Sequence, residues 1–212
     1  MPQKRLAAKL PCYCGVVSYG EIQAYTMRAE VTRKLFTTDE YYRMAEVGIL
    51  TPDDRVELIE GEIIRMSPIG LRHAACVNRV NELFMLSFHG RVTVTVQNPA
   101  HLNQYNEPQP DLLLLKHRED YYASKHPSPE DTLLLLEVSD TTLGFDLNVK
   151  LPIYAATGIP EVWIADLQKN VVRVFRNPEA GQYKTVLTFS AGDALSVLAF
   201  PDVVFKGSDL IG

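Results

Sequence analysis

Two acidic residues stand next to the most apolar segments of the chain. Asp111 precedes the leucine run 112–115, and Glu137 follows the leucine run 133–136. Both runs have the length of β-strands, and their continuous apolar character is typical of central strands covered on both faces. If these strands pair antiparallel, the start of the first lies beside the end of the second. We therefore expect Asp111 and Glu137 to converge at one edge of a sheet.

A convergent pair of carboxylates predicts a metal site. Two such groups repel each other, and one takes up a proton unless a cation lies between them. Hard oxygen ligands suit Mg²⁺ or Mn²⁺ better than Zn²⁺. Polar residues are common at strand ends, so either acid alone would carry little weight. The prediction depends on the pairing of Asp111 with Glu137.

A lysine and a tyrosine follow at helical spacing. Asp146, Lys150 and Tyr154 are four residues apart and share one face of a predicted helix. Lys150 could form an i,i+4 ion pair with Asp146 on a solvated face, worth about 0.3–0.5 kcal/mol. Alternatively, its ammonium lies over the metal site and stabilises the negative charge of a phosphate under attack.

Three acids and one histidine upstream are further candidates. Glu57, Glu60 and Glu62 crowd the segment 56–66, and one of them could complete a metal shell. His73 could contact phosphate or a base, although a lone helical histidine is more often structural. No spacing typical of a zinc site occurs among His89, His101, His117 and His126.

Length and composition predict one globular domain. The chain has 212 residues, of which 46% are hydrophobic, and this is enough for one core. A net charge of -5 counts against a nonspecific nucleic-acid binder, although a basic rim can attract a polyanion locally. Three cysteines form no disulfide framework, and no apolar run approaches the roughly 20 residues of a membrane helix. We expect a cytoplasmic protein without a membrane anchor.

The two ends of the chain differ in character. Residues 1–30 show no sustained periodicity, and we expect a flexible N-terminal extension followed by a domain over residues 31–212. Cys12 and Cys14 lack a second pair, so they are a weak metal-site candidate. Translation could start at Met27 instead of Met1.

Periodicity and turn residues predict a mixed sheet with helices, in an α/β or α+β fold. Thr37 and Glu40 form a capping-box pattern at the start of a helix that stops at Gly48. The remaining predicted elements are a hairpin over 56–66, a helix over 71–88, strands over 91–97, 111–116 and 132–139, a helix over 145–157, and strands over 161–166, 171–176 and 183–190.

The assembled motifs resemble a known pattern. Pro110-Asp111 before a strand, followed by Glu137-Val138-Ser139, is similar to the PD-(D/E)XK nuclease signature. From about residue 35 to 190, the order and spacing resemble the Uma-type family of restriction endonucleases. The matching segments are Glu57-Leu58-Ile59-Glu60-Gly61-Glu62-Ile63, Met66-Ser67-Pro68, His73, Pro110-Asp111, Glu137-Val138-Ser139, Asp146, Lys150, Tyr154, Gly158-Ile159-Pro160-Glu161 and Trp163-Ile164-Ala165-Asp166.

This resemblance implies a restriction-endonuclease-like fold and Mg²⁺-dependent cleavage of DNA. It implies metal ligation by Asp111 and Glu137, with Glu57 as an added acid, and we expect the backbone carbonyl of Val138 to join them. Ser139 occupies the position where the superfamily pattern has a lysine, and the resemblance implies that Lys150 replaces it. His73, Ser139 and Tyr154 are candidates for substrate contacts.

Two other functions fit parts of the pattern. The chain could be a catalytically inactive module with a nuclease fold that binds nucleic acid or a protein partner. It could also hydrolyse a small phosphoester, but it has no Gly-rich phosphate loop. Because one active site cuts one strand, an endonuclease for duplex DNA favours a homodimer, and β segments after residue 171 could supply its interface.

Overall fold

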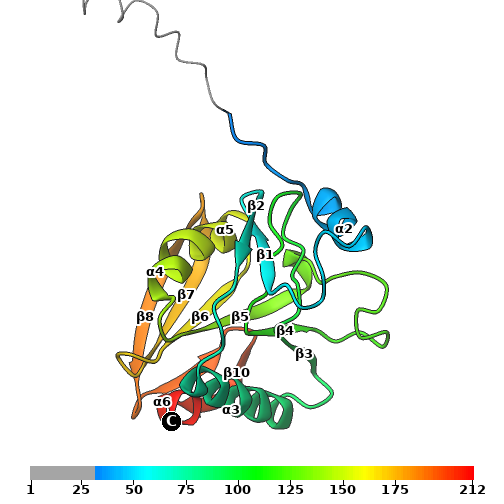
Figure 1. Ribbon diagram of the computed structural model, residues 1–212. Helices are drawn as coiled ribbons and strands as arrows, with labels where there is room; N and C mark the ends of the chain where they lie inside the picture. Colours follow the sequence, from blue (N-terminus) through cyan, green and yellow to red (C-terminus); the bar gives the residue numbers. More distant parts are fainter. Residues whose placement is uncertain (1–31) are drawn as a thin grey trace, which may run out of the picture. The chain divides into compact units, whose positions relative to one another are not determined.

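A six-stranded mixed sheet lies at the centre of the fold. The computed structural model describes residues 32–212, and Leu35–Gly212 form one unit (Figure 1). The strand order is β3-β4-β5-β6-β7-β8, and only the β5–β6 pair within this sheet is parallel. The strands are β3 (Val92–Val96), β4 (Leu112–Lys116), β5 (Thr132–Ser139), β6 (Glu161–Asp166), β7 (Val171–Glu179) and β8 (Gln182–Ser190). The predicted fold class is confirmed. The predicted extension over residues 1–30, with Cys12, Cys14 and Met27, lies outside the described residues.

The leucine-rich strands serve two hydrophobic cores. Leu112 and Leu114 pack in one core with α3 (Leu71–Ser87), whereas Leu113 and Leu115 pack in the other with α5 (Leu151–Ala156). Successive side chains of a strand point to opposite faces of the sheet, so a run without polar residues supplies both cores at once. All four leucines are buried, as expected of a central strand.

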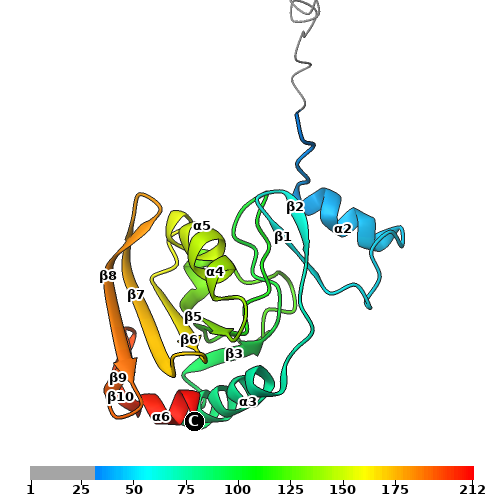
Figure 2. The ribbon, with the colours of Figure 1, turned by 60° about the vertical axis from the view of Figure 1, so that its left-hand side comes forward.

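Helices cover both faces of the sheet (Figures 1 and 2). On one face α3 packs with α6 (Gly207–Ile211) and the hairpin of β9 (Ala194–Val197) and β10 (Phe200–Lys206). The other face carries α4 (Leu143–Phe145), the π-helical turn η2 (Asp146–Lys150) and α5. The predicted helix over 145–157 is therefore three consecutive pieces. The sequence did not predict β9, β10 or α6.

The segment before α3 contains a helix and a hairpin that contact residues 104–107, upstream of β4. In α2 (Thr38–Glu46), Thr37 and Glu40 form the predicted capping box. The hairpin consists of β1 (Val56–Ile59) and β2 (Glu62–Arg65), and Gly61 takes a φ of 75° in its turn. A β-bridge between Leu58 and Glu107 fixes this hairpin to the chain just upstream of β4.

The connection between β4 and β5 contains a short 3-10 helix, η1 (Pro129–Asp131). No helix within residues 32–212 has the length and apolar character needed to cross a membrane.

Candidate active site

Asp111 and Glu137 are brought together by the pairing of β4 with β5. The two strands run antiparallel, and Leu112 is paired with Leu136. Asp111 and Glu137 are the next residues beyond this pair, so they meet where β4 begins. The backbone N–H of Val138 donates to Oδ2 of Asp111 at 2.8 Å. The predicted antiparallel pairing is confirmed.

Asp111 is 7% exposed, and three groups of the protein form hydrogen bonds with its carboxylate. Besides the Val138 N–H, its Oδ2 lies 3.0 Å from Nε2 of His73, near the start of α3. Its Oδ1 accepts a hydrogen bond of 3.1 Å from Nε2 of Gln97, directly after β3. The hydrogen bond to Asp111 raises the pKa of His73, so the imidazolium is favoured beside this carboxylate.

Glu137 receives two donors on the same oxygen. Its Oε1 accepts a 2.6 Å bond from the Tyr154 hydroxyl and a 3.2 Å bond from Nζ of Lys150. Within residues 32–212 no hydrogen bond reaches Oε2, which keeps its lone pairs for a further ligand. Burial raises the pKa of Glu137 to about 8; Lys150 and the Tyr154 hydroxyl oppose the shift, and Asp146 and Asp111 add to it. Burial therefore favours the protonated form of this carboxylate in the metal-free protein.

Lys150 is a buried cation between two glutamates. It is 5% exposed, and its Nζ lies 2.9 Å from Oε2 of Glu57 and 3.2 Å from Oε1 of Glu137. Burial alone would lower the pKa of Lys150, but Glu137 and Glu57 outweigh burial and leave the pKa above its usual value. Lys150 is thus held as an ammonium beside the acid pair. No ion pair joins it to Asp146 among residues 32–212.

Asp146 and Ser139 form a second hydrogen-bonded pair of buried residues near the acids. Oδ2 of Asp146 accepts 2.7 Å bonds from the hydroxyls of Ser139 and Thr142. These contacts tie η2 to the end of β5, and therefore fix the helix that carries Lys150 and Tyr154. Burial raises the pKa of Asp146, and the two hydroxyl donors oppose that shift.

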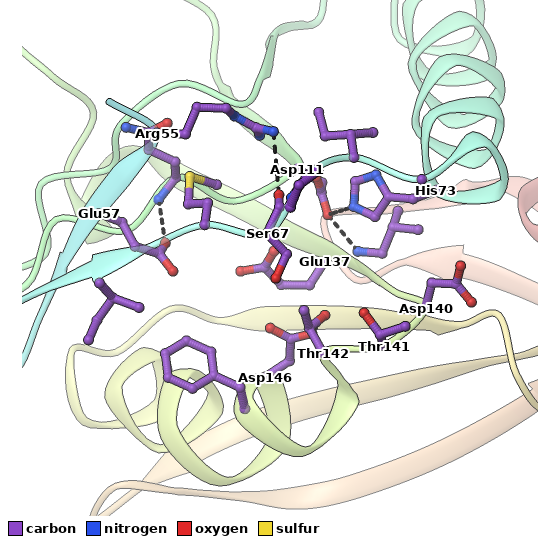
Figure 3. A pocket seen from close by; sticks show the side chains of 18 of the residues that line it. Arg55, Glu57, Ser67, His73, Asp111, Glu137, Asp140, Thr141, Thr142 and Asp146 are labelled. Atoms are coloured by element: carbon purple, nitrogen blue, oxygen red, sulfur yellow. Dashed lines mark hydrogen bonds and ion pairs between the residues drawn. The ribbon is translucent and has the colours of Figure 1, made fainter. Parts of the chain in front are cut away.

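A pocket of about 530 Å³ opens onto these groups (Figure 3). One wall comes from the hairpin and the segment before α3, including Arg55, Arg65 and Ser67. The opposite wall comes from residues 140–146. Asp111, Glu137, Glu57 and Lys150 all line the pocket, and these four come from the residue before β4, from β5, from β1 and from η2.

The donor set at this pocket fits Mg²⁺ or Mn²⁺. Asp111 and Glu137 supply carboxylate oxygens, and a strand residue directs its carbonyl to the same neighbouring strand as its N–H. The carbonyl of Val138 therefore faces the side of Asp111; Ser139, the next residue, turns its carbonyl the other way and accepts the Leu167 N–H at 2.9 Å. Within residues 32–212 no three His, Cys, Asp or Glu side chains are grouped to hold a metal. Mg²⁺ commonly uses one or two carboxylates and keeps several waters, so this smaller set suffices.

The structure separates the predicted site residues into two groups. Asp111, Glu137, Val138, Lys150, Glu57 and His73 line one pocket. Ser139 and Tyr154 are 0% and 1% exposed and support that pocket from behind. Their burial argues against the predicted contacts with substrate. Gln97 and Gln109 also line the pocket and contact Asp111 and Glu57, but the sequence did not predict them. Their only signal in the sequence is their position, directly after β3 and shortly before Asp111.

A mixed sheet flanked by helices, with an acid pair where two central strands meet, is the architecture of a restriction-endonuclease-like nuclease fold. The family model Uma2, described as "putative restriction endonuclease", matches residues 38–206, and the chain belongs to this family. Among solved structures, a "putative nuclease belonging to DUF820" from Anabaena variabilis ATCC 29413 is similar in fold. It shares 14% identity at a TM-score of 0.63, over 83% of this chain and 97% of that one. No curated protein matches.

Proposed function

We propose that the protein is a Mg²⁺- or Mn²⁺-dependent endonuclease that hydrolyses phosphodiester bonds of DNA. The observation that carries this proposal is the grouping of Asp111, Glu137 and Lys150 in one pocket. The acids come from paired strands, and the lysine comes from the helix that follows the second strand. Membership of the restriction endonuclease family supports the same reaction class.

The residues of the pocket divide the chemistry among them. A metal ion held by Asp111, Glu137 and the Val138 carbonyl would polarise the scissile phosphate and lower the pKa of a water nucleophile. Lys150 places a fixed positive charge beside Glu137, where it stabilises negative charge that develops on the phosphate oxygens. Arg55 and Arg65 line the pocket and attract the DNA backbone, despite the net charge of -5.

Plasmid nicking tests this proposal. Purified protein should nick supercoiled DNA with Mg²⁺ or Mn²⁺ but not with EDTA, and Asp111→Ala should abolish nicking. Asp202→Ala is a matched control, because Asp202 lies on the surface and pairs with Arg91. Its activity should equal that of the wild type. Equal nicking by Asp111→Ala would trace the activity to a contaminant and refute the assignment.

The alternative is an inactive nuclease-fold module that binds nucleic acid or a partner. The position of Ser139 favours it, because the superfamily pattern has a lysine there; the contact of Lys150 with Glu137 opposes it. Such a module would show no nicking, and Glu137→Ala would leave its weak Mn²⁺ binding unchanged. We further propose that the nuclease acts as a homodimer on duplex DNA, which sedimentation of the purified protein would reveal.

A further inference from the structure

We propose that Glu57 is a positioning residue that holds the Lys150 ammonium beside Glu137, and that Glu57 is not a metal ligand. This assignment rests on the proposed metal-dependent nuclease function and replaces the metal role that the family resemblance implies for Glu57. Of the acids Asp111, Glu137 and Glu57, the first two would then bind the cation and the third would bind the lysine.

The contacts of Glu57 point to the lysine. Its Oε2 lies 2.9 Å from Nζ of Lys150, which is shorter than the 3.2 Å between Lys150 and Glu137. The same Oε2 accepts the backbone N–H of Gln109 at 3.2 Å. Glu57 is 3% exposed, so these contacts replace the water that the carboxylate has lost. A metal at Oε2 would have to displace the lysine, and within residues 32–212 no three acids, Glu57 included, are grouped closely enough to hold one metal ion together.

Charge balance favours the same division. A buried ammonium is stable only with paired and hydrogen-bonded anions around it. If Glu57 turned to the metal, Lys150 would keep only Glu137, which would itself be neutralised by the cation. The ammonium would then face a divalent ion without a counter-charge of its own. With Glu57 on the lysine, each cation keeps at least one carboxylate.

The backbone fixes Glu57 in this position. Leu58, the next residue of β1, bridges to Glu107, and the side chain of Gln109 donates to the Val56 carbonyl at 3.1 Å. The anchored segment 107–109 continues directly into Asp111. Through Glu57, the hairpin therefore helps to fix the position of the Lys150 ammonium relative to Asp111. The helix that carries Lys150 does not fix this position alone.

A double-mutant cycle distinguishes an anchor from a ligand. Mn²⁺ binding is measured by calorimetry for the wild type, Glu57→Gln, Lys150→Met and the double variant. Glu57→Gln removes one of the two negative charges that balance the Lys150 ammonium. It should weaken Mn²⁺ binding by up to about tenfold, the lower end of the range for an outer-shell partner. The double variant removes one charge of each sign, and its affinity should return to within about threefold of the wild type. Glu137→Gln should weaken binding by more than about 100-fold.

One result would overturn the assignment of Glu57. If the double variant binds Mn²⁺ as weakly as Glu137→Gln does, Glu57 is a metal ligand. Nicking kinetics supply a second criterion, because Glu57→Gln should lower kcat at least tenfold and change KM by less than twofold. A changed KM with an unchanged kcat would contradict a role through Lys150.

Metal-free protein provides a readout that does not depend on nuclease activity. The Lys150 ammonium should give a slowly exchanging ¹⁵N-lysine signal, identified by its loss in Lys150→Met, and Glu57→Gln should shift it and speed its exchange. An unchanged signal in Glu57→Gln would refute the anchor even if the wild type neither cut DNA nor bound Mn²⁺. Failure of nicking alone would instead refute the proposed function.

Discussion

Replacing Tyr154 by Phe removes one hydrogen bond and leaves the packing intact. The Tyr154 hydroxyl donates to Oε1 of Glu137 at 2.6 Å, and the residue is 1% exposed. Phe keeps the ring in the core, so no cavity forms. A hydrogen bond to a charged group contributes about 1.5–3 kcal/mol. For a domain of this size, 1 kcal/mol shifts Tm by about 2–4 °C, so we expect Tm of the metal-free protein to fall by roughly 3–12 °C at pH 9, where Glu137 is largely ionised.

The pH dependence of this loss identifies its cause. Burial raises the pKa of Glu137 to about 8, so between the unfolded value of 4.5 and pH 8 the folded protein binds more protons than the unfolded chain. The stability of the metal-free protein therefore falls as pH rises through that window. Removing the Tyr154 donor disfavours the ionised carboxylate further and raises this pKa. The deficit of Tyr154→Phe should thus be larger at pH 9 than at pH 6.

Tyr183→Phe is the matched control for this experiment. The Tyr183 hydroxyl donates to the neutral backbone carbonyl of Ile159 at 2.8 Å. Its removal should cost about 0.5–1.5 kcal/mol, with no change between pH 6 and pH 9. Thermal unfolding in EDTA at both pH values measures all three proteins. A Tyr154→Phe deficit that is the same at both pH values, or that matches the control, would refute the role assigned to the hydroxyl.

Three further substitutions test the fold and the site. Gly61→Ala should lower the free energy of unfolding in urea by about 1–3 kcal/mol, because φ is 75° and the new Cβ would lie 2.7 Å from a neighbouring side chain. Gly90→Ala, where φ is 72° and the space around the new Cβ is open, should lower it less. Equal losses in the two variants would contradict the steric argument. Glu161→Gln should cost about 3–5 kcal/mol in the same assay, because it breaks the buried ion pair with Arg176 at 2.7 Å; a loss below about 1 kcal/mol would contradict this. Lys150→Met should slow plasmid nicking by about 10²–10³-fold with little change in KM, and wild-type rates would exclude Lys150 from the reaction.

The acid pair was predictable because it depends on one strand pairing. The apolar runs beside Asp111 and Glu137 identify two central strands, and antiparallel pairing then brings the two acids together whatever the rest of the fold. The approach of Lys150 was predictable only as one of two alternatives. Helical spacing allowed an ion pair between Lys150 and Asp146, but in the folded protein Lys150 pairs with Glu57 and Glu137 instead.

Other features depend on contacts that no local pattern encodes. The π-helical turn η2 interrupts a segment whose periodicity predicts a plain helix, and the hydroxyl of Ser139 helps to hold it through Asp146. The position of Glu57, on which its proposed role rests, depends on a bridge between residues 58 and 107, far apart in the sequence. The strands β9 and β10 carry weak alternation, and Pro201 within β10 argues against a strand by propensity.

The most direct test of the metal site is the anomalous diffraction of a crystal soaked in Mn²⁺. We expect a peak within coordination distance of Asp111, Glu137 and the Val138 carbonyl, with Lys150 still beside Glu57. A well-occupied Mn²⁺ elsewhere, with no peak between Asp111 and Glu137, would contradict the proposed metal-dependent nuclease.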